Sequence, residues 1–419
     1  MEQLFNGIHI PRMQKVRQSF ARERVSDIAG VLQNALNQEK IIGTINTGDR
    51  VAIAVGSRGI ANLPQLISEV ITAVKERGAE PFIVPAMGSH GGATEAGQAE
   101  VLAELGVTEA VTGVPVVSNM DVVQLGVTES GFPVYIDKEA YHADAVIITG
   151  RIKPHTSFRA KFESGLAKMI AVGLGKQKGA EMIHEAGVDN IAERVEEAAK
   201  MLLDKSNIVF SVGVLENAYE ETAEIAVLPG DKIMKEEPVL LEKAKQLMPS
   251  ILFSPFDVLI VDEMGKNISG NGMDPNIIRR NYSGSVKHEP LVQRIAILDL
   301  TKESHGNANG MTNADICSRR FFDKIQFAAT YPNPLTNKIA QGVKIPMVME
   351  NDSLAIKAAM KTCFDVDYSR MRIIRIKNTL ELEYIYISEA MLDEAQAHPE
   401  IEPAGDLDYM TFDQHYNLF

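Results

Sequence analysis

The sequence has little cysteine, no long hydrophobic run and no cluster of basic residues. Its two cysteines, Cys317 and Cys363, are far apart, which excludes a disulfide framework and a closely spaced zinc-ligand motif. The N-terminus has no apolar signal core, and no later run reaches the roughly 18 apolar residues that cross a bilayer. We therefore predict a soluble, cytoplasmic protein that does not use a membrane.

The charge of the chain is acidic, with a formal net charge of −14. A polyanion is held mainly by cationic side chains, so this balance argues against a nucleic-acid partner. The 419 residues suffice for two or three domains, and a hydrophobic content of 45% allows a sizeable core.

Short apolar runs alternate with amphipathic helices up to about residue 250. Apolar strands that alternate with helices predict an α/β fold with a parallel sheet covered on both faces. The helical periodicity is clearest from Leu63 to Val74, before Gly78, and from Ile191 to Leu202. The predicted strands are Arg50–Val55, Pro81–Pro85, Ala145–Thr149 and Ile208–Val214.

A second, smaller α/β domain is predicted to start near Phe256, with the active site in the cleft between the domains. We place the N-terminal domain at 1–252, the C-terminal domain at 253–395 and a tail that packs back on the body at 396–419. The C-terminal domain is predicted to contain strands, a helical stretch and a hairpin that turns at Asn378. The strands are Asp257–Val261 and Ile295–Leu300, the helical stretch is Asn313–Ala328, and the hairpin is Met371–Ser388.

Two loops that follow predicted strands carry polar residues between glycines. Ser57, Arg58 and Gly59 suit a phosphate, because backbone N–H groups and a guanidinium stabilise an anion; a plain turn with an exposed arginine is the alternative. His90 follows the next strand, and Thr94 is placed to cap the following helix. An imidazole at a strand end is suited to proton transfer, although a lone loop histidine more often has no such role.

Two further segments carry candidate side chains. Pro154 favours an extended Lys153, so the loop Gly150–His155 projects His155 from a strand end. The run Ser164–His184 is not a dinucleotide motif, because Lys178 stands where G-x-G-x-x-G has its last glycine, and it also fails the Walker A pattern. Its apolar surroundings could make Lys168 nucleophilic; snorkelling to the surface is the alternative.

Taken together and in this order, these segments resemble the lactate racemases and their relatives. The likeness lies in Ser89–Glu95, in Gly150–His155 and in Ser164–Gly175, with Met182–His184 at the end of the last run. It covers most of the chain in domain order, and the specific motifs lie in the N-terminal two-thirds.

The resemblance implies roles for single residues. Lys168 matches the lysine that tethers a nickel-pincer nucleotide, a pyridinium bis-thiocarboxylate mononucleotide, through a thioamide. His184 matches the nickel-ligating histidine, and His90 and His155 match the acid–base pair that flanks the substrate. Arg58, with Ser57 and Gly59 beside it, matches the arginine near the cofactor phosphate.

The implied activity is racemisation or epimerisation of a 2-hydroxy acid by reversible hydride transfer from its α-carbon to the cofactor. The pincer and one imidazole complete a square-planar nickel site, so a clustered metal motif is not required. The implied partners are a small 2-hydroxy acid and the enzymes that synthesise the cofactor, and protein made without those enzymes is expected to lack it. The oligomeric state is left open, a homodimer included.

This chain departs from the family pattern around the substrate. The family often has an acidic residue just before the phosphate arginine, whereas this chain has Val55–Gly56–Ser57. The interval from His155 to Lys168 is also longer than in lactate racemase itself. In the second domain, Lys266, Asn271 and Asp274 are candidate substrate contacts, with a turn-rich connector as the alternative. His305 is a further loop candidate. The substrate is therefore expected to differ from lactate.

Two other functions are considered. A nicotinamide- or flavin-dependent oxidoreductase would act on the same hydroxy acids, but the missing dinucleotide motif argues against it. A non-catalytic nucleotide-binding relative would not need an acid–base pair of histidines.

Overall fold

The computed structural model describes residues 2–282 and 292–418. The chain forms two compact units: Ala21–Met248, here called the N-unit, and Met1–Phe20 together with Pro249–Phe419, here called the C-unit. Each unit is described by itself. Within the described residues, no helix combines the length and the apolar composition needed to cross a membrane.

The N-unit is built on a sheet with the strand order β3-β2-β6-β7-β8, in which β2, β3, β6 and β7 are parallel and β8 is an antiparallel edge strand. The strands are β2 (Arg50–Val55), β3 (Glu80–Pro85), β6 (Ala145–Arg151), β7 (Ile208–Glu216) and β8 (Thr222–Pro229), with a separate hairpin of β4 (Val122–Val127) and β5 (Pro133–Asp137). The predicted parallel α/β sheet is therefore confirmed, and each predicted strand is present.

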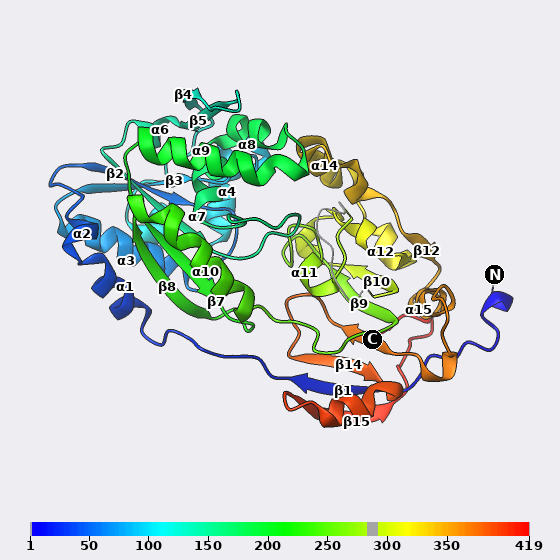
Figure 1. Ribbon diagram of the computed structural model, residues 1–419. Coiled ribbons are helices and arrows are strands. Elements are labelled where there is room, and N and C mark those ends of the chain that lie inside the picture. The colour runs from blue at the N-terminus through cyan, green and yellow to red at the C-terminus, as the bar shows by residue number, and fades with distance from the viewer. Residues whose placement is uncertain (1, 283–291, 419) are drawn as a thin grey trace. The chain divides into compact units, whose positions relative to one another are not determined.

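Helices cover both faces of this sheet (Figure 1). Successive residues of a strand point to opposite faces, so Ile53 of β2 packs with α1 and α3, whereas Ala54 packs with α7, α9 and α10. The helices are α1 (Ile28–Leu36), α2 (Glu39–Ile42), α3 (Leu63–Glu76), α4 (Glu95–Glu104), α5 (Glu109–Thr112), α6 (Lys138–Tyr141), α7 (Leu166–Lys168), α8 (Lys176–His184), α9 (Ile191–Lys205) and α10 (Ile233–Leu247).

A single π-helical turn, η3 (Met169–Gly173), connects α7 with α8. The wide turn shifts the register of the side chains, a feature that is frequent at functional sites. Lys168 is the last residue of α7, and His184 is the last residue of α8. The two residues therefore stand at the outer ends of one helical segment.

The C-unit is built on a mixed sheet with the order β12-β11-β10-β9-β13-β14-β1-β15. Neighbours from β12 to β13 are parallel, and β14, β1 and β15 continue the sheet antiparallel. The strands are β1 (Met13–Gln18), β9 (Val258–Met264), β10 (Arg294–Leu300), β11 (Ile316–Ser318), β12 (Met347–Met349), β13 (Ile373–Ile376), β14 (Tyr384–Ser388) and β15 (Ile401–Asp408). The helices are α11 (Pro275–Ile278), α12 (Arg319–Asp323), α13 (Phe327–Thr330), α14 (Pro332–Asn337), α15 (Asp352–Lys361) and α16 (Leu392–Ala397).

The start and the end of the chain differ from the predicted domains 1–252, 253–395 and 396–419. The first twenty residues belong to the C-unit, because β1 pairs with β14 on one side and with β15 on the other. The tail supplies β15, so it extends the sheet rather than only packing on it. These partners lie hundreds of residues from β1, and local periodicity cannot reveal such a pairing.

One predicted element of the C-unit is wrong and another is confirmed. The stretch 313–328 is not one helix, because Ile316–Ser318 forms the parallel strand β11 between β10 and β12. The hairpin is present: β13 and β14 are antiparallel, and the side-chain oxygen of Asn378 accepts hydrogen bonds from the N–H groups of Leu380 and Glu381.

Candidate functional site

The candidate residues of the N-unit follow the carboxyl ends of its parallel strands. Arg58 follows β2, His90 follows β3 and His155 follows β6. Parallel strands end at one edge of a sheet, which is where open α/β folds bind ligands. Strands β3, β2 and β6 are neighbours in the sheet, so the loops that follow them lie side by side and can form one site.

The π-helical turn packs directly against these loops. A Cβ on Gly56 would lie 3.1 Å from the Met169 sulfur, and one on Gly150 would lie 3.0 Å from Met169 Cγ. A Cβ on Gly173 would lie 2.6 Å from the Ala86 carbonyl oxygen. Glycine is required at Gly173, where a side chain would meet the backbone, whereas a side chain at Gly56 or Gly150 would press on the flexible Met169 side chain.

Lys168 and His155 are in direct contact. The Lys168 Nζ lies 2.8 Å from His155 Nε2. The other ring nitrogen, His155 Nδ1, accepts a hydrogen bond from the Ser157 N–H at 3.0 Å, and the ring stacks on Phe158 with 4.1 Å between centroids. The imidazole is therefore fixed in position on both sides.

These hydrogen bonds assign the proton on the imidazole. A neutral imidazole has one donor nitrogen and one acceptor nitrogen, and Nδ1 of His155 is the acceptor. The proton therefore resides on Nε2, and Nε2–H can donate to Lys168 only if that amine is neutral. The geometry is thus compatible with the unprotonated, nucleophilic form of Lys168.

The electrostatics of the two groups make deprotonation of Lys168 easier than that of an ordinary lysine. Burial, together with the charges of Arg58 and Lys153, lowers the pKa of Lys168 from 10.5 to about 8. Burial, followed by the charges of Lys168 and His184, lowers the pKa of His155 well below its ordinary value. A neutral imidazole beside a readily deprotonated amine results.

His184 faces the same amine from the end of α8. Burial and then the charge of Lys168 lower the pKa of His184 to about 4, so its ring is neutral near pH 7. Its Nδ1 atom is buried and has no hydrogen-bond partner. A buried ring nitrogen without a partner has an unused lone pair, which is what a metal ligand requires.

His90 is held by the loop that carries the predicted phosphate residues. Its Nδ1 is hydrogen-bonded to the hydroxyl of Ser57. Arg58 is next in the chain, and its charge acts on Lys168, while Gly59 follows in the same exposed turn. The candidate side chains of the N-unit thus lie on one set of loops and helix ends. Their cofactor, metal and acid–base roles stay predictions.

Two buried glutamates missed by sequence reasoning support the site. Glu163, whose side chain is fully buried, accepts the His155 N–H at 2.7 Å and pairs with Lys245 at 3.1 Å. Glu237 of α10 accepts the Ala167 N–H at 2.7 Å and so caps the first turn of α7, one residue before Lys168. The charge pattern gave no signal for either, because the contacts of Glu237 with Ala167 and of Glu163 with Lys245 join distant segments.

Glu237 predicts a pH-dependent stability. Burial raises its pKa from 4.5 to about 7, although hydrogen bonds from Ala167 and Leu166 oppose the shift. An acid with a raised folded-state pKa stabilises the fold fully below its unfolded pKa and loses this contribution as the pH rises through about 7. Glu237→Gln should remove about 2–3 kcal/mol of pH dependence between pH 5 and pH 8.

Chemical unfolding at pH 5 and pH 8 measures this effect. Glu242→Gln, an exposed position on the same helix, is the matched control and should keep the pH dependence of the parent. An unchanged pH dependence in Glu237→Gln would contradict the assignment of the buried proton to this carboxyl.

The candidate residues of the C-unit have partners within their own loop. Lys266 Nζ donates to the Gly270 carbonyl at 2.6 Å, and Asn271 is buried. Asp274 caps α11 by accepting the Asn276 N–H at 2.9 Å. His305 is exposed and ends a short 3₁₀ turn with φ 47°. These contacts favour a structural role for Asp274, and substrate contact by Lys266 and Asn271 stays a prediction.

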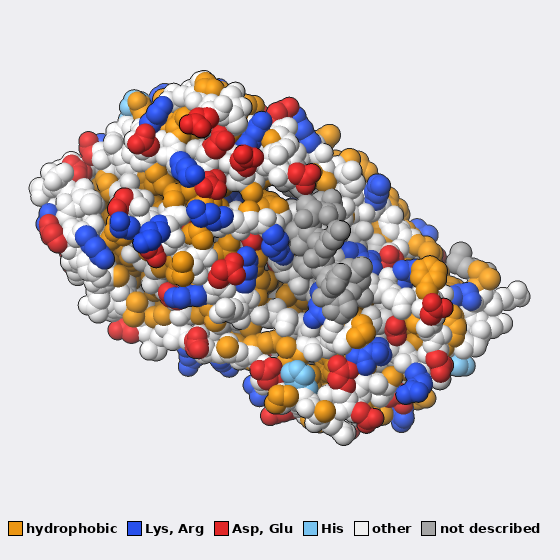
Figure 2. All heavy atoms as spheres, in the orientation of Figure 1, with side chains coloured by type: hydrophobic (Ala, Val, Ile, Leu, Met, Phe, Trp, Pro, Cys, Tyr) orange, Lys and Arg blue, Asp and Glu red, His pale blue; other side chains and the backbone are white. Residues whose placement is uncertain are grey.

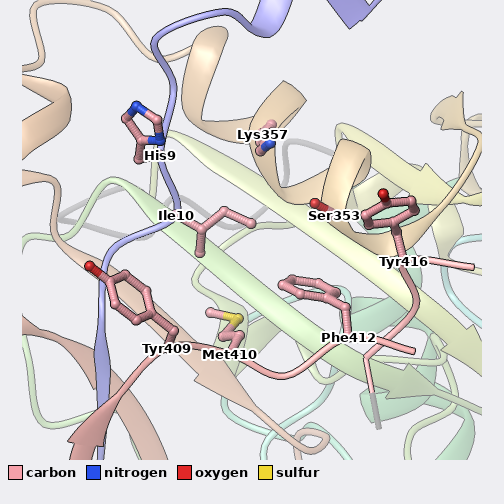
Figure 3. A pocket seen from close by; sticks show the side chains of 8 residues that line it. All are labelled: His9, Ile10, Ser353, Lys357, Tyr409, Met410, Phe412 and Tyr416. Carbon is pink, nitrogen blue, oxygen red and sulfur yellow. The ribbon is translucent and has the colours of Figure 1, made fainter. Parts of the chain in front are cut away.

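The C-unit also contains an open pocket that none of the predicted residues lines (Figure 3). Its wall combines the rings of Tyr409, Phe412 and Tyr416 with Lys357 and His9.

The two free cysteines, Cys317 and Cys363, are buried, and burial raises the pKa of each thiol to about 12. They are therefore poor metal ligands at neutral pH. On the face shown in Figure 2, acidic and basic side chains are interspersed.

Residues 7–195 match the family model described as the lactate racemase N-terminal domain. No curated protein matches. Among solved structures, the chain is similar to a Thermotoga maritima protein, with 14% identity over 67% of this chain and 72% of that one and a TM-score of 0.48.

It is also similar to the lactate racemase apoprotein from Thermoanaerobacterium thermosaccharolyticum, with 20% identity over 67% of this chain and 69% of that one and a TM-score of 0.43. The matched range 7–195 contains all five candidate side chains of the N-unit: Arg58, His90, His155, Lys168 and His184. The part of the chain from residue 7 to residue 195 is therefore similar to the lactate racemase N-terminal domain.

Proposed function

We propose that the protein is a racemase or epimerase of a 2-hydroxy acid that uses a nickel-pincer nucleotide bound covalently to Lys168. The observation that carries the proposal is the pair of Lys168 and His155, in which a neutral imidazole lies 2.8 Å from an amine whose pKa is about 8. An amine that is partly unprotonated near neutral pH is suited to a covalent bond with a carbonyl-type carbon.

The residues present fit the cofactor. Lys168 supplies the amine for the tether, and His184 supplies a neutral ring with an unpartnered Nδ1. Among the described residues, no group of three or more His, Cys, Asp or Glu side chains could hold a metal ion. A pincer ligand that fills three positions of a square plane needs only one protein donor, so this site is sufficient for it.

The bound group would supply a hydride acceptor at the substrate α-carbon. The protein contributes proton transfer at the substrate hydroxyl. His155 holds its exchangeable proton on Nε2, because Nδ1 accepts the Ser157 N–H. The Ser57 hydroxyl is hydrogen-bonded to Nδ1 of His90, and we propose that the His90 imidazole exchanges the proton on the other side.

Cations around Lys168 are suited to the negative charges of the ligands. Arg58 and Lys153 both act on Lys168 electrostatically. A guanidinium binds a phosphate in a bidentate manner, so Arg58 is the proposed phosphate contact, with Ser57 and Gly59 beside it. Lys153 lies next to the His155 loop, where it would favour a carboxylate substrate. The identity of the 2-hydroxy acid stays open.

The alternative of a nicotinamide- or flavin-dependent oxidoreductase is disfavoured by the position of its nearest motif. Gly173 and Gly175 lie in the π-helical turn and directly before α8, whereas a dinucleotide fingerprint lies between a strand and a helix. A non-catalytic relative would not need the acid–base pair that we propose for His90 and His155.

The direct test is protein produced together with the cofactor-synthesis enzymes. Intact-protein mass should show an adduct that peptide mapping places on Lys168, with about one nickel per chain. A panel of single-enantiomer 2-hydroxy acids should then show racemisation or epimerisation of at least one member. Adduct and nickel without turnover of any member would favour the non-catalytic alternative.

A variant of the proposed ligand separates the metal from the tether. His184→Ala should lose most of the nickel yet retain the adduct mass of the organic part, because the amine of Lys168 is untouched. Metal analysis and intact mass on the same sample provide the measurement. Stoichiometric nickel in His184→Ala would remove His184 from the metal site.

A further inference from the structure

Lys176 lies in the middle of the segment between Lys168 and His184 and belongs to none of the roles above. Its side chain is fully buried, and its backbone has φ 52°, which is uncommon for a residue with a Cβ. Its Nζ donates to the Pro85 carbonyl at 2.6 Å and to Gln98 Oε1 at 3.2 Å, and it pairs with Asp137 at 3.1 Å. The ammonium thus uses all three of its donors.

Gln98 continues this network toward the His90 loop. It is fully buried on α4, and its Nε2 donates to the carbonyl of Gly88 at 2.9 Å and to that of His90 at 3.3 Å. Lys176 occupies the amide oxygen, so the amide cannot flip without placing an acceptor against two carbonyls and a donor against an ammonium. The orientation of Gln98 is therefore set by Lys176.

The network connects two parts of the proposed active site. Pro85 is the last residue of β3, directly before the His90 loop, and Lys176 is the first residue of α8, the helix that ends at His184. The Gly88 N–H also donates to the Gly173 carbonyl at 3.2 Å, which adds a backbone link between the same two segments. A buried charge needs full pairing, so the arrangement is rigid.

We infer that Lys176 and Gln98 are positioning residues that fix the His90 loop relative to the Lys168–His184 segment. The inference rests on the proposed function for the role of His90, but the holding of the loop does not depend on it. Neither residue touches the reacting groups, so both act through the carbonyls that flank His90.

Gln98→Glu tests this inference without removing the partner of Lys176. The carboxylate keeps an acceptor for the ammonium but has no hydrogen to donate to the Gly88 and His90 carbonyls. The loop should loosen while the Lys176–Asp137 pair stays. Lys176→Met is less informative, because it leaves a buried Asp137 without its cation and is expected to impair folding. Gln177→Glu, an exposed position next to Lys176, is the matched control.

Hydrogen exchange of the full chain without cofactor provides the first measurement. In Gln98→Glu, peptides that cover residues 86–94 should exchange at least about tenfold faster, with unchanged exchange in the rest of the N-unit sheet. Gln177→Glu should match the parent. Parent-like exchange of 86–94 in Gln98→Glu would overturn the inference, whatever the protein catalyses.

The loaded enzyme provides the second measurement. Gln98→Glu should retain the Lys168 adduct and nickel and should lower kcat about 10-fold or more with little change in KM, since the acid–base group is misplaced while binding is kept. Loss of the adduct, or a change in KM alone, would contradict positioning of His90. If the parent itself has no adduct and no activity, the proposed function fails, and the exchange experiment still decides the structural inference.

Discussion

Lys168→Ala is expected to abolish the covalent adduct completely and, with it, all turnover. The amine that would form the thioamide is removed, and no other amine lies hydrogen-bonded to His155 Nε2 in the described residues. Intact-protein mass and nickel content after production with the cofactor-synthesis enzymes measure the first effect, and enantiomer exchange measures the second.

This loss should not result from unfolding. Burial lowers the pKa of Lys168 to about 8, so the charged ammonium destabilises the folded state at neutral pH. Replacement by alanine removes this destabilisation. The lost alkyl packing acts in the opposite direction, and each effect is about 1–3 kcal/mol. The Tm should therefore change little. Lys161→Ala, an exposed lysine of the same loop, should retain adduct and activity. An adduct of full occupancy on Lys168→Ala would end the proposal for the tether.

His90→Ala is expected to keep the adduct and the nickel but to lower turnover by about 10²–10⁴-fold, the usual contribution of a general acid–base group. The His90 ring is hydrogen-bonded to the Ser57 hydroxyl, and the proposed tether and metal ligand are the separate side chains of Lys168 and His184, so the cofactor site should be preserved. The measurement is kcat for both substrate enantiomers, with intact mass on the same preparation.

The control for this variant is His142→Ala, an exposed histidine at the end of α6. It should have the turnover of the parent. Full activity in His90→Ala would remove the acid–base role of His90, whereas loss of the adduct would mean that His90 supports cofactor attachment instead.

Several features of the site could be read from local sequence. The strands that end before Arg58, His90 and His155 are short apolar runs followed by glycine, and this signal does not depend on distant contacts. Thr94 caps α4 by accepting the Gly97 N–H, as its position before a helical pattern predicts. Motif order then predicted a likeness to the lactate racemases, and the match of residues 7–195 to the lactate racemase N-terminal domain supports that prediction.

Other features could not be read because their partners are distant in sequence. Glu237 and Glu163 are ordinary acidic residues in the sequence, and only packing brings their carboxylates to the Ala167 N–H and to the Lys245 ammonium. In the sequence, Lys176 resembles the lysine of an incomplete Walker A motif, and only the structure reveals its three buried partners. Strand β1 contains too few apolar residues for its pairing with β14 and β15 to be predicted from the sequence.

The sequence by itself determined the parallel α/β order and the residue types at the strand ends, because strand and helix periodicity and loop chemistry are local properties of the chain. Only the tertiary structure decided that Lys168 is hydrogen-bonded to His155, that His184 keeps an unpartnered nitrogen and that the chain begins in the C-unit. The physical reason is that pKa values and hydrogen-bond partners depend on burial and on charges from other segments, which chain order does not specify.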